Sequence, residues 1–175
     1  NRMDAMSLPL IAILVIFPAA MAYAAASDIV TMTISNRLCL LLVAAFALCA
    51  ASLGLSWPQI GSHVAAGLLV LLFGIGLFAV GWVGGGDAKL VAATALWFGF
   101  EPLLSYLLVT AIAGGVLTLL LHQLRQAPLP GRAENWAWAK RLHGVQQGVP
   151  YGVALAFGAL AVLPQTAIWR AAIGV

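Results

Sequence analysis

Two aspartates, Asp28 and Asp87, are the side chains of this sequence whose type and position best suit a chemical reaction. The chain has only five acidic residues, and these two each adjoin a long apolar segment. If such segments lie in a membrane, an ionisable group beside them is costly and is usually retained for a function. Two carboxyl groups that meet can share one proton, so that one draws a proton from water while the other donates a proton to a carbonyl group. The alternative at this stage is that each aspartate only caps a helix at the headgroup layer.

Three glycines, Gly84, Gly85 and Gly86, directly precede Asp87. Because glycine has no Cβ, another backbone can approach such a loop closely, and an extended peptide can pair along it. Glycine-rich loops also cradle phosphate groups, but no Gly-Lys-Ser or Gly-Lys-Thr pattern follows here. The loop is therefore a candidate substrate-binding element, and a flexible turn is the simpler alternative.

Other kinds of chemistry find little support in the sequence. The three histidines, His63, His122 and His143, show no metal-ligand spacing, and no G-x-S-x-G nucleophile motif is present. Cys39 and Cys49 lie in one apolar run, where a helix would separate them by about 15 Å along its axis, too far for a disulfide. We therefore expect no metal site and no cofactor.

The composition indicates the class of protein. Apolar residues make up 63% of the 175 residues and charged residues only 7%, whereas a soluble domain carries about 25% charged residues. Too few polar side chains are present to cover a water-facing surface. This excludes an ordinary soluble domain, a disordered segment and a nucleic-acid-binding module, so nucleic acid is not an expected partner. The sequence predicts an all-α integral membrane protein surrounded by the lipid bilayer.

Six apolar segments predict about six transmembrane helices in a single membrane-embedded domain, residues 1–175. The segments cover residues 8–26, 38–55, 63–83, 88–100, 103–121 and 149–169. The fourth is short for a full span, since about 20 residues are needed to cross. A short, more polar stretch, residues 29–36, separates the first two segments, and Pro18 is expected to kink the first.

The positive charges predict how the segments are oriented. With six spans, one side of the membrane holds six Lys or Arg residues and the other side two. The first set is Arg37, Lys89, Arg125, Arg132, Lys140 and Arg141, and the second is Arg2 and Arg170. The positive-inside rule places the first set in the cytoplasm and both chain termini on the non-cytoplasmic side. Asp28 and Asp87 then share the cytoplasmic face.

A polar stretch, residues 123–148, is expected to form a cytoplasmic loop. Within it, Trp138, Leu142 and Val145 recur at helical spacing, as in a short helix that lies in the headgroup region. A solvated basic loop anchored by Trp136 and Trp138 explains the same residues equally well. The sequence of residues 134–145 leaves both interpretations open.

Three short motifs resemble those of the type IV prepilin peptidases, a family of membrane aspartyl proteases of the GxGD class. Residues 84–90, Gly-Gly-Gly-Asp-Ala-Lys-Leu, resemble the GxGDxKL signature. Upstream, Asp28 followed by Ile34-Ser35-Asn36 resembles the family's first catalytic region, an Asp followed by Ile-Pro-Asn. Ser35 stands where the family usually has proline, which leaves the local turn less fixed. Late in the chain, Pro150-Tyr151-Gly152 resembles the segment that opens the family's last helix.

The resemblance implies a membrane aspartyl endopeptidase with Asp28 and Asp87 as its catalytic pair. By the same resemblance, the three glycines and Lys89 contact the substrate. Lys89 would either stabilise the loop or attract an acidic residue early in the mature pilin. A lysine whose charge simply reaches the membrane interface explains that position equally well.

The substrates that the resemblance implies are prepilin or pseudopilin helices, whose basic leader is removed at the cytoplasmic face of the bacterial inner membrane by a multi-pass enzyme. Larger members of the family carry an additional cytoplasmic segment with paired CxxC zinc motifs, associated with N-methylation of the processed pilin. No CxxC motif occurs in this sequence. The chain therefore resembles the short members that serve tight-adherence (Flp) pili and lack the methyltransferase domain.

Three other functions remain open from the residues alone. A small proton-coupled membrane carrier could use Asp28 and Asp87 as a relay, although such carriers often show internal repeats, which this sequence lacks. A scaffold subunit of a secretion machine would tolerate loss of both carboxylates. A relative of the presenilin-like proteases would cut within a membrane span. The sequence does not decide whether the protein forms a homo-oligomer.

Overall fold

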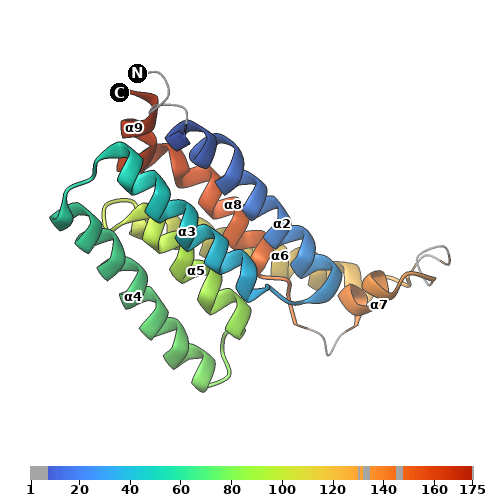
Figure 1. The fold of residues 1–175 in the computed structure, drawn as a ribbon. Helices are drawn as coiled ribbons and strands as arrows, with labels where there is room; N and C mark the ends of the chain where they lie inside the picture. Colours follow the sequence, from blue (N-terminus) through green and yellow to red (C-terminus); the bar gives the residue numbers. More distant parts are fainter. Residues whose placement is uncertain (1–7, 130, 132–134, 145–147, 175) are drawn as a thin grey trace.

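The computed structural model describes residues 8–129, 131, 135–144 and 148–174, and this part of the chain consists of helices and their connections, with no strand. The helices are η1 (Ala12–Ile16), α2 (Phe17–Thr31), α3 (Asn36–Leu53), α4 (Trp57–Ala79), α5 (Gly85–Phe98), α6 (Leu103–Gln126), α7 (Ala137–His143), α8 (Gly152–Val162), η3 (Leu163–Gln165) and α9 (Ala167–Ile173). The all-α prediction is confirmed (Figure 1).

Four helices are long and apolar enough to cross a membrane: Leu8–Thr31, Asn36–Leu53, Trp57–Ala79 and Leu103–Gln126. A fifth candidate is the pair Gly152–Gln165 and Ala167–Ile173, if this bent pair is one span. The chain is thus a membrane protein with four or five candidate spans in its described part, and the predicted number of about six is not confirmed. The difference lies in α5, whose 14 residues fall short of the length of a span.

The first helix extends further than its apolar residues indicate, because it continues through Asp28 to Thr31. Its last turn accommodates hydroxyl groups, since Thr31 Oγ1 donates to the Ser27 carbonyl at 2.7 Å. Near its start the helix widens into the π-helical turn η1, where the N–H of Phe17 bonds to the carbonyl of Ala12. This turn lies where Pro18 lacks an N–H and its ring displaces the preceding carbonyls.

The connection between α3 and α4 is shorter than expected, because α4 begins at Trp57 rather than near His63. Ser56 and Gln59 form a capping box, in which Gln59 Oε1 accepts the Ser56 N–H at 2.8 Å. Pro58 lies in the first helical turn, where a missing N–H has no cost. Residues 56–58, whose types predict a turn, therefore start a helix.

The last apolar segment, residues 149–169, was expected to be continuous and is broken. Around Pro164 the chain forms the short η3 helix, and α8 and α9 are bent by 56°. Proline removes a hydrogen bond and clashes with the preceding turn, which explains the break. The Thr166 side chain then caps α9 by accepting the N–H of Trp169 at 3.1 Å.

α5 is the central helix of the bundle, with α3, α4 and α8 packed around it (Figure 1). α4 packs almost entirely against α5. Two glycines on α4 permit this approach, because a Cβ atom built on Gly67 would lie 3.3 Å from Leu96 Cβ and one on Gly74 would lie 3.0 Å from Ala88 Cβ. Close packing of small residues is a main source of helix association in a membrane, where both helices already contact apolar lipid.

Side-chain hydrogen bonds add to this packing at two places on α5. Trp97 Nε1 donates to the Leu42 carbonyl of α3 at 2.9 Å. His63 Nδ1 of α4 lies 2.8 Å from the carbonyl of Leu96, one of the last carbonyls of α5. Both bonds satisfy polar groups that would be costly to leave unpaired in lipid.

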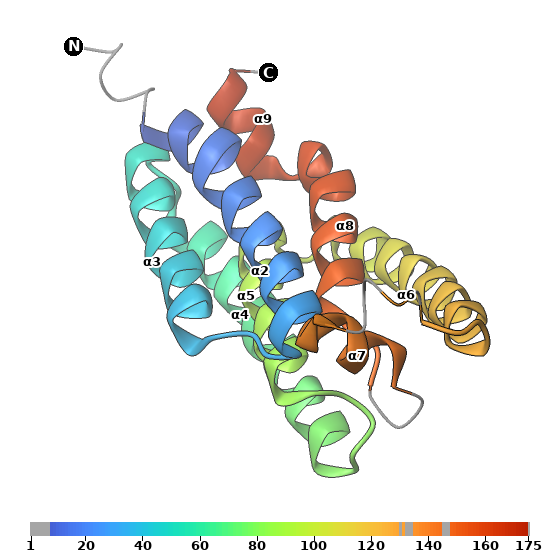
Figure 2. The ribbon, with the colours of Figure 1, turned by 90° about the vertical axis from the view of Figure 1, so that its right-hand side faces the viewer.

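One end of the bundle collects the C-terminal ends of α2 and α4 and the N-terminal ends of α3, α5 and α8 (Figures 1 and 2). The start of the first helix and α9 lie at the opposite end. We call the first of these the aspartate end, because Asp28 lies in the last turn of α2 and Asp87 in the first turn of α5.

The predicted loop, residues 123–148, contains the end of α6 and the short helix α7. Arg125 ties the two together, because its guanidinium donates to the carbonyls of Leu142 and Gly148 at 2.9 and 2.8 Å. Of the two interpretations left open for residues 134–145, the structure has a short helix over Ala137–His143, and its place in the headgroup region stays a prediction. Glu134 and Val145 lie outside the described residues, as do Arg2 and Arg132 of the orientation argument.

Candidate active site

Asp28 and Asp87 line the same cavity, which has a volume of about 810 Å³. Its walls come from the end of α2, the facing sides of α4 and α6, the start of α5 and the start of α8. The two aspartates are far apart in the sequence, and they come together because α4 returns the chain to the aspartate end, where α5 begins (Figure 2).

The Asp28 carboxylate is held from a distant part of the chain. Asp28 is only 5% exposed, and its Oδ2 accepts the backbone N–H of Gly152 at 2.7 Å. Gly152 is the first residue of α8, so Asp28 satisfies one of the free N–H groups at the start of that helix. Asp28 thus does contact the start of a helix, as the alternative left open by the sequence has it, but that helix is α8, which begins far away in the sequence.

Gly152 makes this contact possible because it has no side chain. A Cβ atom built on Gly152 would lie 2.9 Å from Asp28 Oδ2 and 3.0 Å from Asp28 Cβ. Only glycine lets α8 begin directly against the carboxylate. Gly152 is thus a site residue that our sequence reasoning did not include, although Pro150-Tyr151-Gly152 was one of the three matching motifs.

Asp87 lies in the first turn of α5, which is not among the candidate spans. Gly84 is the N-cap residue of this helix, and no side chain bonds to the cap. Asp87 is therefore not an N-cap, which was the second alternative. Burial and, to a lesser extent, the charge of Asp28 raise the pKa of Asp87 to about 7. Near neutral pH the two carboxyl groups can thus hold one proton between them.

The three glycines before Asp87 have different surroundings. Gly84 lines the cavity, and a Cβ atom built on it would lie 2.9 Å from Asp87 Oδ2. A Cβ on Gly85 would lie 3.3 Å from the Phe78 ring, and one on Gly86 would lie 3.2 Å from Ile34 Cβ. Gly85 and Gly86 thus let the start of α5 pack closely against Phe78 and Ile34. A role of these glycines in substrate binding stays a prediction.

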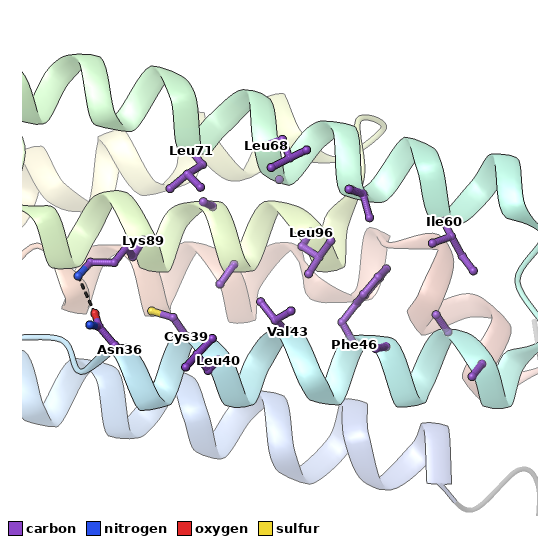
Figure 3. Close-up of a pocket in the computed structure, with 17 residues that line it drawn as sticks. Asn36, Cys39, Leu40, Val43, Phe46, Ile60, Leu68, Leu71, Lys89 and Leu96 are labelled. Atoms are coloured by element: carbon purple, nitrogen blue, oxygen red, sulfur yellow. Dashed lines mark hydrogen bonds between the residues drawn. The ribbon is translucent and has the colours of Figure 1, made fainter.

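Lys89 faces away from this cavity. Two residues along a helix rotate a side chain by about 200°, and Lys89 accordingly lies in the groove between α3, α4 and α5. Its Nζ donates to Asn36 Oδ1 at 2.6 Å (Figure 3). Asn36 is the last residue of the motif that begins at Asp28, so this bond joins the two motifs. Contact between Lys89 and a substrate stays a prediction.

Residues 15–119, more than half of the chain, match the type IV leader peptidase family. The chain belongs to this family. The matched residues include both aspartates, the three glycines, Lys89 and Asn36, whereas Gly152 lies beyond them. No curated protein and no solved structure matches the chain.

Membership of the type IV leader peptidase family confirms the resemblance seen in the motifs and supports a leader peptidase function for this membrane protein. It does not decide between the tight-adherence type and other members. It gives no support to the carrier interpretation.

The rest of the cavity of this leader peptidase is largely apolar. Leu69, Phe73 and Leu77 of α4 face it from one side, and Leu103 and Leu107 of α6 from the other. Thr110 of α6 also lines the cavity, but its hydroxyl lies against Gly158 of α8. The hydroxyl of Thr110 on α6 is buried and has no hydrogen-bond partner within the described residues.

The donor groups of the described residues favour acid–base chemistry. No three His, Cys, Asp or Glu side chains among them lie close enough to hold a metal ion. Both cysteines are free thiols, Cys49 being buried in the core. What the site brings together is two carboxyl groups beside an apolar cavity.

Proposed function

We propose that this protein is an aspartic endopeptidase that removes the basic leader of a prepilin or pseudopilin at the cytoplasmic face of the bacterial inner membrane. The observation that carries the proposal is that Asp28 and Asp87 line one cavity, in a chain of the type IV leader peptidase family. The raised pKa of Asp87 supports a pair that shares a proton at neutral pH.

In the proposed reaction, Asp28 is the general base and Asp87 the general acid. Asp28 takes a proton from a water molecule, whose oxygen bonds to the scissile carbonyl carbon. Asp87 gives its proton to the carbonyl oxygen, which forms a gem-diol. The C–N bond then breaks as a proton passes to the leaving amine and the carbonyl reforms, and the pair again holds one proton.

This assignment rests on the different surroundings of the two carboxyl groups. Asp28 has a fixed donor in the Gly152 N–H, whereas no hydrogen bond to the Asp87 side chain is found within the described residues. The proton that the pair holds is therefore assigned to Asp87.

The shape of the cavity fits a substrate whose cleavage site precedes a hydrophobic helix. The aspartates lie at the aspartate end, and the apolar side chains of α4 and α6 continue from them along the bundle. We place the hydrophobic helix of the substrate against this wall.

The charges of the chain support the proposed orientation. Five of the six residues of the predicted cytoplasmic set are described, and all lie on elements or termini at the aspartate end (Figures 1 and 2). Arg170 lies in α9 at the opposite end, where it forms a 3.0 Å ion pair with Glu101. By the positive-inside rule the aspartate end faces the cytoplasm.

The test is cleavage of a co-expressed tight-adherence-type prepilin, with the pilin mass read by mass spectrometry. Wild type is expected to remove the leader, whereas D28N and D87N are expected to leave it in place. Asn retains an oxygen that can accept the Gly152 N–H, so D28N should keep the local fold. E101Q is the matched control, because it removes an acid at the opposite end of the bundle.

Each result has a defined meaning. Processing that survives both D28N and D87N contradicts the two-aspartate mechanism. Unprocessed pilin with well-folded wild type contradicts the assigned substrate. An unmethylated new N-terminus is the result expected of a tight-adherence-type enzyme.

A further inference from the structure

A second cavity, of about 730 Å³, lies on the other side of α5. We call it the α3–α4 groove, because α3 and α4 form its two walls and α5 its floor (Figure 3). Val43 and Ala47 line it from α3, Leu68 and Leu71 from α4, and Leu96 from α5. Neither aspartate lines this groove, so it is distinct from the site described above.

The polar groups of the groove are confined to one end. Lys89 and Asn36 lie there, joined by a 2.6 Å hydrogen bond, and apolar side chains line the rest of the groove (Figure 3). The ammonium group of Lys89 has no carboxylate within salt-bridge distance in the part of the chain that the structure describes. A neutral amide does not compensate its charge. The groove thus combines one uncompensated cation with a long apolar surface.

The α3–α4 groove is long enough for an extended apolar chain. It extends along α3 from Asn36 to Ala51, which is about 22 Å of helix at 1.5 Å per residue. One leaflet of a bilayer has hydrocarbon about 15 Å thick, so a lipid acyl chain fits along the groove.

We propose that the α3–α4 groove binds one anionic phospholipid, with an acyl chain along the groove and the headgroup phosphate on Lys89. The charge of the phosphate complements that of Lys89, and the acyl chain complements the apolar walls. Asn36 Oδ1 holds the ammonium group at the end of the groove, where its remaining protons point to the headgroup. A zwitterionic lipid fills the same walls but adds a positive charge beside the lysine.

The α3–α4 groove also differs from the place assigned to the substrate helix. α5 separates the two cavities, with Asp87 and Val91 on one side and Lys89 and Ala93 on the other. A substrate helix that contacts the aspartates therefore does not lie on Lys89. The lipid proposal concerns the opposite face of α5 and does not depend on the peptidase activity.

The test is lipid binding to the purified full chain, measured by native mass spectrometry after titration with phosphatidylglycerol or phosphatidylcholine. Wild type is expected to bind one phosphatidylglycerol and to prefer it over phosphatidylcholine. K89Q is expected to weaken phosphatidylglycerol binding about tenfold and to abolish the preference, because a hydrogen bond to a charged group is lost. K89R keeps the charge and should retain the preference.

A second pair of variants tests the apolar part of the groove. A47W places a large ring in the groove and is expected to weaken binding of both lipids, whereas A44W adds the same ring to an exposed position of α3 outside the groove. All variants are compared by size-exclusion profile and thermal unfolding, so that a folding defect is recognised.

Two results overturn the proposal. One is an unchanged phosphatidylglycerol preference in K89Q. The other is equal lipid binding by A47W and A44W. If the first result is found and K89Q also alters cleavage of a prepilin with an acidic residue after its leader, Lys89 binds the substrate rather than a lipid.

Discussion

The contact between Gly152 and Asp28 gives the sharpest prediction for this enzyme, because one methyl group is enough to disturb it. In G152A the new Cβ would lie 2.9 Å from Asp28 Oδ2 and 3.1 Å from Asp28 Cγ. To reach ordinary contact distance, the carboxylate must move by about 0.5 Å, since carbon contacts are about 3.5 Å at their optimum. The 2.7 Å hydrogen bond from the Gly152 N–H is then strained or lost.

The size of the effect follows from this displacement. A hydrogen bond to a charged group contributes about 1.5–3 kcal/mol, and 1.36 kcal/mol corresponds to a factor of about ten in rate. Misplacement of a reacting group by about 1 Å costs about 100-fold. We therefore expect G152A to lower kcat of leader cleavage by about 10- to 100-fold. KM should change little, because Gly152 contacts the carboxylate rather than the apolar wall.

The assay is cleavage of a purified prepilin by the purified enzyme in lipid nanodiscs, with kcat and KM determined separately. G115A is the matched control, since it makes the same change in α6 where nothing lies within 4 Å of the added Cβ. Its kcat should stay within about twofold of wild type, because Gly115 does not line the cavity with the aspartates, and its stability should change by about 0.5 kcal/mol or less, as is usual for surface substitutions. A G152A enzyme with wild-type kcat would refute the positioning role of Gly152. An equal loss of kcat and thermal stability in both variants would refute it as well.

Two further predictions concern the proton of the pair and the packing of α4. Burial and the charge of Asp28 raise the pKa of Asp87 to about 7. The cleavage rate should therefore fall as pH rises above about 7, because the pair then loses its shared proton. A pH–rate profile that is flat between about pH 6 and 9 contradicts this prediction. G74L places a side chain against Ala88 and should destabilise the fold by about 1–3 kcal/mol through overpacking. G76L, whose Cβ has nothing within 4 Å, should unfold at nearly the wild-type temperature in the same detergent.

The chemistry of the site could be predicted from the sequence better than the geometry. Asp28 and Asp87 stand out because so few acidic residues occur in this chain, and the structure brings them to one cavity. The rotation between Asp87 and Lys89 also follows from helix geometry alone, although we assigned both to one site. The bond between Asp28 and Gly152 joins residues 124 positions apart and has no signal in local sequence.

The ends of the helices were harder to predict than their existence. Ser56 and Pro58 read as a turn, yet a capping box makes them the start of α4. An apolar run across Pro164 reads as one helix, yet it is bent by 56°. In these segments hydrophobicity reports contact with lipid, and the local hydrogen bonds and proline decide where a helix begins or breaks.

The high hydrophobicity of these helices also hides which face of a helix is buried. Nine residues of α5 are buried, from Ala88 to Phe98, and they cover nearly all its sides. Such a helix has no polar side to mark the surface. Its central position therefore could not be predicted from periodicity, and it became evident only from the packing of α3, α4 and α8 around it.

The attachment of α4 mainly to α5 has a consequence for the whole enzyme. α4 forms a wall of both the cavity with the aspartates and the α3–α4 groove, and α5 is the partition between these two compartments. A displacement of α4 along or away from α5 therefore changes the width of both compartments. Occupancy of the two compartments is then thermodynamically linked, and by reciprocity each occupant changes the affinity of the other by the same factor.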